Sequence, residues 1–351
     1  MSTMPEDLRS LIDSFGFDHW GLVELKIPLS LSIYQNWINE GRHADMEYLS
    51  RHLEQKKDPT NWLPQMRSAI VIGLSYIPHP RPSNATKTLS ALKIARYARG
   101  EDYHQFFQSR LENLCLKLQE KYSGEVFQAF SDSAPLMDRD LAYQAGLGWF
   151  GKNSCLIDRK KGSFFLIGEI LTSLQLSTIK APAADFCGTC NRCVEACPTD
   201  AILANRTLAA DRCISYLNIE SRGIPSKALR QSMGNWLFGC DICQEVCPWN
   251  QKILRTEKDS SEPHRSEVIE ALRFLLTTSN SQLEKHFSAT PLLRRRSFGL
   301  KRSALIVAEN LIAHELTKEI IDLQQNNPRL AGLAAEILES FNKFSKDTQD
   351  G

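Results

Sequence analysis

The cysteines of this chain are concentrated in one segment, where their spacing is that of iron–sulfur ligands. Ten cysteines occur among 351 residues, and eight of them lie between Cys187 and Cys247. The first four follow the pattern C-x2-C-x2-C-x3-C-P, which ends at Cys197 and Pro198. In bacterial two-cluster ferredoxins this pattern gives three thiolates to one [4Fe–4S] cluster and the fourth to its neighbour. The segment is therefore predicted to hold two clusters that transfer electrons one at a time.

The second group of cysteines departs from a simple repeat. Cys240, Cys243 and Cys247 keep the spacing, but Leu237 stands where a symmetrical copy would place a cysteine, and Cys213 is the nearest remaining candidate for the missing ligand. We assume that the lone ligands are exchanged as they are in two-cluster ferredoxins. The first cluster then takes Cys187, Cys190, Cys193 and Cys247, and the second takes Cys240, Cys243, Cys197 and Cys213.

Structural zinc and disulfides are the alternatives for the same residues. Zinc suits four thiolates, but its usual C-x2-C pairs do not predict a closely spaced triple or a proline after the last cysteine. Disulfides require an oxidising compartment, and no secretory leader opens this chain. Cys115 and Cys155 stand apart from the eight, and we interpret both as small buried hydrophobic residues.

Composition and charge are those of an ordinary globular protein. Hydrophobic residues make up 42% of the chain and charged residues 24%, and no apolar run approaches the ~20 residues that span a bilayer. The start of the chain has neither a basic region followed by an apolar one nor a twin-arginine pair, so we expect a cytoplasmic protein. The net charge is only +1, so a nucleic-acid partner would have to meet a local basic patch.

The elements that must position the cysteines fall into three segments. Residues 1–180 mix helical and strand patterns and predict an α+β (or α/β) domain. Residues 181–255 form the ferredoxin-like module, and residues 256–351, after a polar stretch at 256–265, are helical and suggest a HEAT-like arrangement. Helices are expected at 8–15, 31–40, 111–122, 136–145, 267–276, 281–287, 300–314 and 330–341, and strands at 69–76, 126–130 and 163–171.

A second group of chemically capable residues lies between Ser131 and Ser154. Asp132 comes directly after a predicted strand and before a predicted helix, where a side chain is either catalytic or a helix N-cap. The glycines at 146, 148 and 151 allow a helix end and a close backbone approach to a bulky ligand. Their spacing and the order of elements do not fit a dinucleotide fingerprint.

Two motifs of this chain resemble the epoxyqueuosine reductase family. They are Tyr-Ala-Arg-Gly-x-Asp-Tyr-His, from Tyr97 to His104, and Ala-Gly-Leu-Gly-Trp-x-Gly-Lys, from Ala145 to Lys152. Together with the eight cysteines, the resemblance covers most of the chain. It implies a cytoplasmic enzyme that reduces epoxyqueuosine to queuosine at the wobble position of tRNA. It also implies a cobalamin held in a nitroreductase-like N-terminal domain beside two [4Fe–4S] clusters.

The resemblance also implies roles for individual residues. The chain has no D-x-H-x-x-G stretch, and Asp18-His19-Trp20-Gly21 fails that spacing, so the cobalamin would be base-off with no protein histidine on cobalt. Asp132 matches the proton donor of the family. The stretches expected to surround the corrinoid contain, besides Asp132, the residues Lys57, Tyr97, Ala98, Asn153, Ser154, Ser215 and Asp241. Lys57, Asn153 and Ser154 are equally well explained as surface or turn-capping residues.

A run of cations marks a candidate RNA contact. Five basic residues and no acid occur between positions 294 and 302, namely Arg294, Arg295, Arg296, Lys301 and Arg302. Such a run is usually a solvated helix face. In a nearly neutral chain that resembles a tRNA-modifying family, we favour contact with RNA phosphates. Phe298 within the run is either a base-stacking residue or part of the core.

The predicted parts are sufficient for reductive loss of an epoxide oxygen. Removing the oxygen as water takes two electrons and two protons, and two clusters can deliver the electrons in turn. A buried carboxylic acid with a raised pKa could protonate the departing oxygen, and Asp132 is our choice. We expect a monomer that binds the anticodon stem-loop of tRNA and takes electrons from an external low-potential donor. The alternative functions are a corrinoid reductive dehalogenase, which usually carries an export signal, and a plain ferredoxin-type electron carrier.

Overall fold

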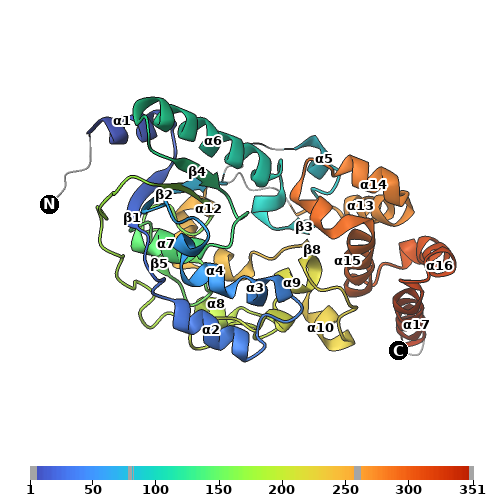
Figure 1. The fold of residues 1–351 in the computed structure, drawn as a ribbon. Coiled ribbons are helices and arrows are strands. Elements are labelled where there is room, and N and C mark those ends of the chain that lie inside the picture. The colour runs from blue at the N-terminus through green and yellow to red at the C-terminus, as the bar shows by residue number, and fades with distance from the viewer. Residues whose placement is uncertain (1–5, 78–80, 82, 257–261, 348–351) are drawn as a thin grey trace.

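The computed structural model describes residues 6–77, 81, 83–256 and 262–347. A sheet lies towards one end of the molecule and a group of helices at the other (Figure 1). Two expectations fall partly outside these residues. The expected absence of an export leader concerns the start of the chain, of which residues 1–5 are not described, and the polar separator at 256–265 includes 257–261.

The main sheet has four antiparallel strands in the order β1 (His19–Glu24), β2 (Ser68–Ser75), β7 (Phe165–Thr172) and β4 (Phe127–Phe130). Along β2, alternate side chains join different hydrophobic clusters, Ile70 on one face and Val71 on the other. A strand that is buried on both faces reads as a continuous apolar run. The strand predicted at 69–76 is this one, whereas β1 was not predicted.

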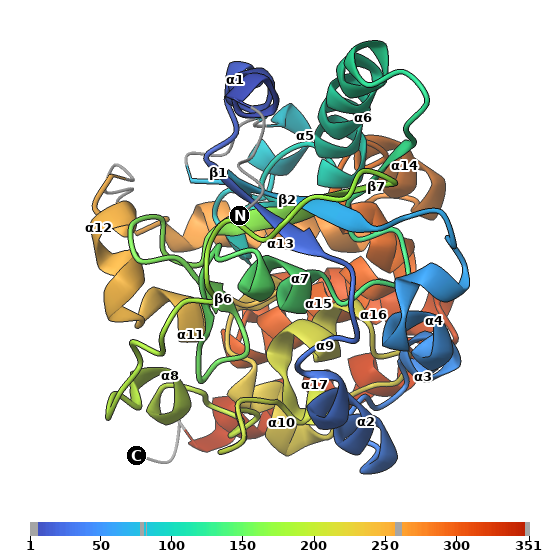
Figure 2. The same cartoon turned by 60° about the vertical axis from the view of Figure 1, so that its left-hand side comes forward.

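Helices cover both faces of the sheet (Figure 2). On one face α1 (Glu6–Ser14) and α6 (Tyr103–Lys121) bury apolar side chains, and on the other α7 (Asp138–Gln144) does so. Gly168 of β7 allows α6 to lie close, because a Cβ there would be 2.6 Å from Leu111 Cδ1. Helix α6 begins well before the predicted start at 111, since Asp102 caps it by accepting from the backbone N–H of His104 at 3.1 Å.

The cysteine module is built from short elements tied to the N-terminal part of the chain. Helices α8 (Arg192–Glu195) and α11 (Ile242–Glu245) each lie within one of the cysteine runs. Strand β8 (Trp236–Phe238) pairs in parallel with β3 (Lys93–Ile94), which belongs to the N-terminal segment. The remaining short elements are α2 (Leu31–Asn39), α3 (Glu47–Arg51), α4 (Leu53–Lys57), α5 (Asn84–Lys87), α9 (Ile214–Ile219), α10 (Lys227–Ser232), α12 (Gln251–Leu254), β5 (Trp149–Phe150) and β6 (Leu156–Ile157).

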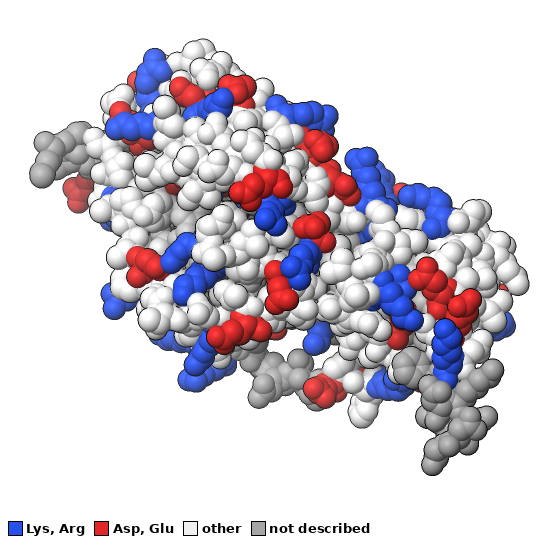
Figure 3. Space-filling view, turned by 90° about the horizontal axis from the view of Figure 1, so that it is seen from below, with Lys and Arg blue, Asp and Glu red and all other residues white. Residues whose placement is uncertain are grey.

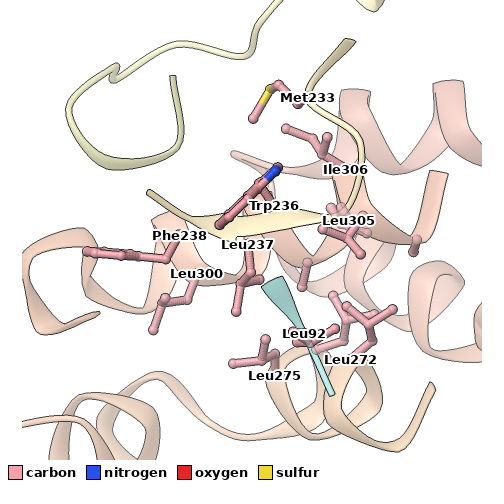
Figure 4. Packing of buried hydrophobic residues seen from close by; sticks show 14 of the residues in the cluster. Leu92, Met233, Trp236, Leu237, Phe238, Leu272, Leu275, Leu300, Leu305 and Ile306 are labelled. Carbon is pink, nitrogen blue, oxygen red and sulfur yellow. The ribbon is translucent and has the colours of Figure 1, made fainter. Parts of the chain in front are cut away.

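The C-terminal segment is helical, as predicted. It consists of α13 (Arg265–Thr277), α14 (Asn280–His286), α15 (Arg296–Asn310), α16 (Thr317–Asn326) and α17 (Ala331–Asp347), of which α16 was not predicted. One hydrophobic core joins these helices to the cysteine module. In Figure 4, Trp236, Leu237 and Phe238 of β8 pack with Leu272 of α13 and Leu305 of α15.

The fold is therefore α+β, with the cysteine module and the C-terminal helices sharing a core. In the part of the chain that the structure describes, no helix is long and apolar enough to cross a membrane. Acidic and basic side chains alternate over the face drawn in Figure 3, consistent with the net charge of +1. The HEAT-like and nitroreductase-like details stay predictions.

Candidate active site

A cavity of about 690 Å³ lies where the three segments of the chain meet. The N-terminal segment contributes Tyr97, Asp102, Tyr103, His104 and Asp132, the cysteine module contributes Cys213, Ser215 and Phe238, and the C-terminal segment contributes Arg294 and Arg296. The volume is within the ~300–1,000 Å³ of small-molecule sites. A cysteine expected to bind a cluster and the expected proton donor are thus in the wall of the same cavity.

Asp132 lies in a turn directly after β4 and adopts a left-handed backbone conformation with φ of 51°. Its Oδ2 accepts a hydrogen bond from the hydroxyl of Tyr103 at 2.9 Å and is 3.8 Å from His104 Nε2. Helix α7 begins only at Asp138, and its N-cap is Met137. Asp132 is therefore not a helix cap, and its strained conformation holds the carboxylate towards the cavity.

The expectation that Asp132 is a buried acid with a raised pKa is wrong. Its side chain is 61% exposed. Partial burial raises the pKa of Asp132, but the interactions with His104 and Tyr103 outweigh it and hold the pKa below the usual 3.8. The carboxylate is therefore ionised at neutral pH in this structure.

His104 carries the proton that Asp132 lacks. Its Nδ1 is 2.8 Å from Asp102 Oδ1, and its ring stacks on Tyr103 with centroids 4.1 Å apart. The hydrogen bond with Asp102, followed by the interaction with Asp132, raises the pKa of His104 to about 9 against the opposing effect of burial. The imidazole is therefore protonated at neutral pH, with a carboxylate facing each ring nitrogen.

Two further carboxyl groups lie behind Asp132. Glu169 of β7 is fully buried, and neither of its carboxylate oxygens has a hydrogen-bond partner among the described residues. Burial, and then the neighbouring Asp138 and Asp132, raise the pKa of Glu169 well above its usual range. Burial and Asp132 likewise raise the pKa of Asp138 to about 7, although Lys56 and Arg139 oppose the shift. The site thus holds an ionised carboxylate beside two carboxyl groups of raised pKa.

The four cysteines assigned to the first cluster surround a second cavity. Cys187, Cys190, Cys193 and Cys247 line a space of about 240 Å³. Among the described residues, no three His, Cys, Asp or Glu side chains meet as the ligands of a single metal ion would.

The second four cysteines also influence one another. Burial, and then Cys213 and Cys197, raise the pKa of the Cys240 thiol. The Cys155 thiol is the largest cause that raises the pKa of Cys243, followed by burial and then by Cys240 and Cys213. Cys155 differs from its predicted role, because its thiol lies against Cys243. Cys115, by contrast, is buried in the core between α6 and the sheet, and burial raises its pKa to about 12.

The residues expected around the corrinoid are only partly brought together. Tyr97, Asp132 and Ser215 line the large cavity, and the other five do not. Lys57 pairs with Glu54 at 2.5 Å, and Ala98 is buried in the core. The buried side chains of Asn153, Ser154 and Asp241 bond to Cys243, Arg206 and Arg96, respectively.

The basic run divides into surface and structural residues. Arg294 and Arg296 are exposed at the cavity, where Arg294 is 2.7 Å from Glu220 and Arg296 is 3.3 Å from Glu284. The expectation that Lys301 and Arg302 contact RNA is wrong, because both are buried. Lys301 donates to the Leu276 carbonyl at 3.1 Å.

Arg302 donates to the carbonyls of Leu217, Ser221 and Gly223 and so holds the loop after α9. Arg295 also points inwards, because it donates to the Ile219 carbonyl and its Nε and Nη2 are buried. Its expected contact with RNA is not supported by this geometry. Phe298 is partly buried, with the Arg329 guanidinium 3.7 Å from its ring centroid.

Sequence reasoning missed Tyr103 and His104 as functional residues, although the motif that carried the resemblance contains both. An aromatic and a titratable residue directly after the helix-capping Asp102 are a local signal for a functional site. The signal does not identify Asp132 as the partner of His104, because the two residues come together only when β4 pairs with β7.

Two family models match segments of this chain. Residues 186–250 match a model described as a 4Fe-4S double cluster binding domain, and residues 56–133 match one described as epoxyqueuosine reductase QueG, DUF1730. An epoxyqueuosine reductase of Cyclobacterium marinum is 38% identical over 302 residues, which cover 85% of this chain and 90% of the relative.

Solved structures give the same relationship. An epoxyqueuosine reductase with an epoxyqueuosine-modified tRNA-Tyr stem loop superposes with a TM-score of 0.80 and 27% identity, covering 96% of this chain and 89% of that one. A structure of epoxyqueuosine reductase from Bacillus subtilis, with its catalytic aspartate loop swung out of the active site, gives 0.81 and 26%, covering 96% and 90%.

Proposed function

Because the chain belongs to the epoxyqueuosine reductase family, we propose that it reduces epoxyqueuosine to queuosine at the wobble position of tRNA. The observation that carries this proposal is the placement of Asp132, His104 and Cys213 in the wall of one cavity. A proton source and the electron-transfer module thus reach the same space, as a reductive removal of oxygen requires. The clusters belong to the double-cluster domain at 186–250.

We further propose that the cavity holds cobalamin in its base-off form. The cavity fits such a group, because it opens between all three segments and touches both a cluster cysteine and the acid. Tyr97 and Ser215 would contact it. Asp102 holds Nδ1 of His104, and the raised pKa of about 9 keeps both ring nitrogens protonated at neutral pH, so His104 has no free lone pair to offer cobalt. Bound there, cobalamin would supply reducing electrons next to the substrate.

The ligand division predicted from the sequence remains our proposal for the clusters. Cys187, Cys190, Cys193 and Cys247 would hold the outer cluster, and Cys240, Cys243, Cys197 and Cys213 the inner one. Support comes from the separate cavity of the first set and from the place of Cys213 in the wall of the active cavity. Electrons from an external low-potential donor would then enter at the outer cluster and leave from the inner one.

For the protons, the chain offers a relay rather than a single buried acid. We propose that each of the two protons passes from Nε2 of His104 through Oδ2 of Asp132 to the departing oxygen. His104 is reprotonated from solvent between the two transfers, and the 3.8 Å between the two atoms shortens as each proton moves. Asp102 keeps the ring oriented through Nδ1, and Tyr103 steadies the receiving carboxylate by donating to it. Because the pKa of His104 is raised to about 9 and that of Asp132 is held below 3.8, His104 rather than Asp132 carries the proton at neutral pH.

We propose that the anticodon stem-loop lies at the mouth of the cavity, over Arg294 and Arg296. Both guanidiniums are exposed there and can reach phosphates. We also propose a monomeric, cytoplasmic protein with the segment limits 1–180, 181–255 and 256–351. The nitroreductase-like and HEAT-like descriptions of the first and last segments belong to this proposal.

The direct test uses the protein reconstituted with both clusters and cobalamin under anaerobic conditions. Incubation with epoxyqueuosine-containing tRNA and a strong reductant should yield a nucleoside lighter by one oxygen atom, measured by mass spectrometry after digestion. An unchanged nucleoside, while both clusters are demonstrably reduced and the tRNA is bound, would contradict the proposal.

A further inference from the structure

The cavity of the outer cysteine set opens at the surface beside an aromatic side chain. Lys152, Phe186 and Arg192 line it together with the four cysteines. Phe186 is 41% exposed. Helix α8, which carries Arg192, lies at the periphery of the molecule (Figure 2). The active cavity is lined instead by Cys213 of the other set.

The exposed aromatic residue is held in a fixed position. Phe186 makes edge contacts with Trp149, at a centroid distance of 5.1 Å, and with Trp249, at 5.9 Å. The two tryptophans also contact each other at 5.2 Å, and Trp149 is buried. Phe186 is therefore the outer member of a packed group that lies against Cys187 and Cys247. A rigid aromatic surface of this kind loses little side-chain entropy when a partner covers it.

Cations surround Phe186. The guanidinium carbon of Arg159 is 5.2 Å from its ring centroid, and Lys152 donates to Asn191 Oδ1 at 2.7 Å. In the described part of the chain, Lys152, Arg159 and Arg192 are not within ion-pair distance of any carboxylate, unlike Arg206 nearby, which pairs with Asp185 at 2.5 Å. Glu195 is the exposed acid on the same helix as Arg192. The surface is therefore locally positive in a chain whose net charge is only +1.

We propose that Phe186, Lys152, Arg159 and Arg192, which we call the entry rim, form the docking site of a small acidic electron-carrier protein. The chain needs electrons from outside, and the outer cluster is where a carrier can approach most closely. Opposite charges speed such encounters by ~10–10³-fold, and the interfaces are small. The inference rests on the proposed function only in requiring external electrons.

The test measures reduction of the clusters without tRNA, so it does not depend on turnover. Anaerobic holoprotein is mixed with reduced flavodoxin as the acidic carrier, and bleaching of the iron–sulfur absorbance is followed by stopped flow. The variant Lys152→Gln/Arg159→Gln/Arg192→Gln should be reduced at least about tenfold more slowly at low salt, with a flatter salt dependence. The matched control is Lys285→Gln/Lys318→Gln/Lys343→Gln, which removes exposed cations from the C-terminal helices and should behave as the parent.

Three further measurements separate the alternatives. Reduction by dithionite, which needs no docking, and the cluster potentials from a redox titration should be unchanged in the entry-rim variant. If dithionite reduced the entry-rim variant equally slowly, or if a shift in cluster potential accounted for the slower rate, the cations would be setting the reduction potential of the cluster instead of binding the carrier. Loss of tRNA affinity without loss of carrier-driven reduction would assign the rim to RNA. Phe186→Ala should slow carrier-driven reduction several-fold at an unchanged salt slope, and parent-like rates in both variants would overturn the proposal.

Discussion

Asp132 and His104 face each other across the wall of the active cavity, with the carboxylate Oδ2 3.8 Å from the imidazole Nε2. This distance is too long for a good hydrogen bond but short enough for the two charges to stabilise each other. A single acid of raised pKa would both hold the proton and deliver it, whereas in this pair the two tasks fall to different residues. In the proposed relay, His104 stores the proton and Asp132 delivers it to the substrate.

Asp132→Ala should lower turnover by ~10²-fold or more, the usual effect of removing a general acid, while clusters and corrinoid remain bound. Single-turnover rates and the iron and cobalt contents are the measurements. Asp132→Asn keeps the shape and serves as the matched variant. Near-normal turnover in a fully loaded Asp132→Ala protein would remove this residue from the mechanism.

His104→Gln should change the pH dependence of the single-turnover rate. With a pKa of about 9, the parent keeps its imidazolium at neutral pH and loses it as the pH rises, so its rate should fall through that region. The variant has no such proton to lose and should be slower at neutral pH with a flatter alkaline limb. The contribution of His104 to the free energy of unfolding also falls with rising pH. It is fully present below pH ~6.5 and is lost as the pH rises through the folded-state pKa of about 9. An alkaline limb that survives in the variant would assign it to another group.

Cys213→Ala should remove one cluster and spare the other. Iron should fall from about eight to about four atoms per chain, since each [4Fe–4S] cluster carries four. Iron analysis and electron paramagnetic resonance of the reduced protein give the count. Cys115→Ala is the control, because Cys115 lies in the core between α6 and the sheet. If Cys213→Ala keeps both clusters at full occupancy, another residue completes the inner set.

Arg294→Ser/Arg296→Ser should weaken tRNA binding and flatten its salt dependence, by up to ~0.9 in the log–log slope for each duplex phosphate that is no longer neutralised. Arg302→Met should behave differently, because Arg302 satisfies buried backbone carbonyls. It should lower the free energy of unfolding by ~1–3 kcal/mol and leave the salt slope unchanged. Binding titrations across salt concentrations, with thermal melts, distinguish the two. Parent-like affinity and slope in the double variant would make Arg294 and Arg296 ordinary surface residues.

Glu169→Gln should flatten the dependence of stability on pH. The raised pKa of Glu169 means that its contribution to stability is complete below about pH 4.5 and is lost as the pH rises towards the folded value. Glutamine cannot ionise, so the variant should match the parent in acid and exceed it at neutral and alkaline pH. The measurement is the free energy of unfolding from chemical denaturation at a series of pH values. Identical pH dependence in parent and variant would mean that the pKa of Glu169 is not raised by folding.

The sequence predicted those features that depend on local spacing. The cysteine pattern is local, because a thiolate triple within seven residues must be presented by one turn of chain, and the family model at 186–250 agrees with it. The same holds for β2, whose two buried faces leave a continuous apolar run. Helix α16 was missed because it buries only Ile320 and Leu323, and β1 was missed because it has polar residues at both ends and a glycine between them.

Features that depend on the packing of distant segments could not be predicted. The run from Arg294 to Arg302 holds five cations and no acid, yet Arg302 is buried against the carbonyls of α9 and the loop after it, while Arg294 remains at the surface. The charge state of Asp132 likewise depends on Tyr103 and His104, which reach it only after β4 and α6 have packed on the sheet. Burial, rather than residue type, sets the role of each of these side chains.

The shared core beneath β8 makes the packing of the cysteine module depend on helices that come much later in the chain. Residues that complete this core extend to Phe341, whereas the last cysteine of the module is Cys247. The ribosome synthesises the cysteines before α13–α17, and domains fold as units during synthesis. The nascent chain therefore presents eight thiols on an unfinished scaffold. The cysteine module therefore gains its complete hydrophobic packing only once the C-terminal helices have been made.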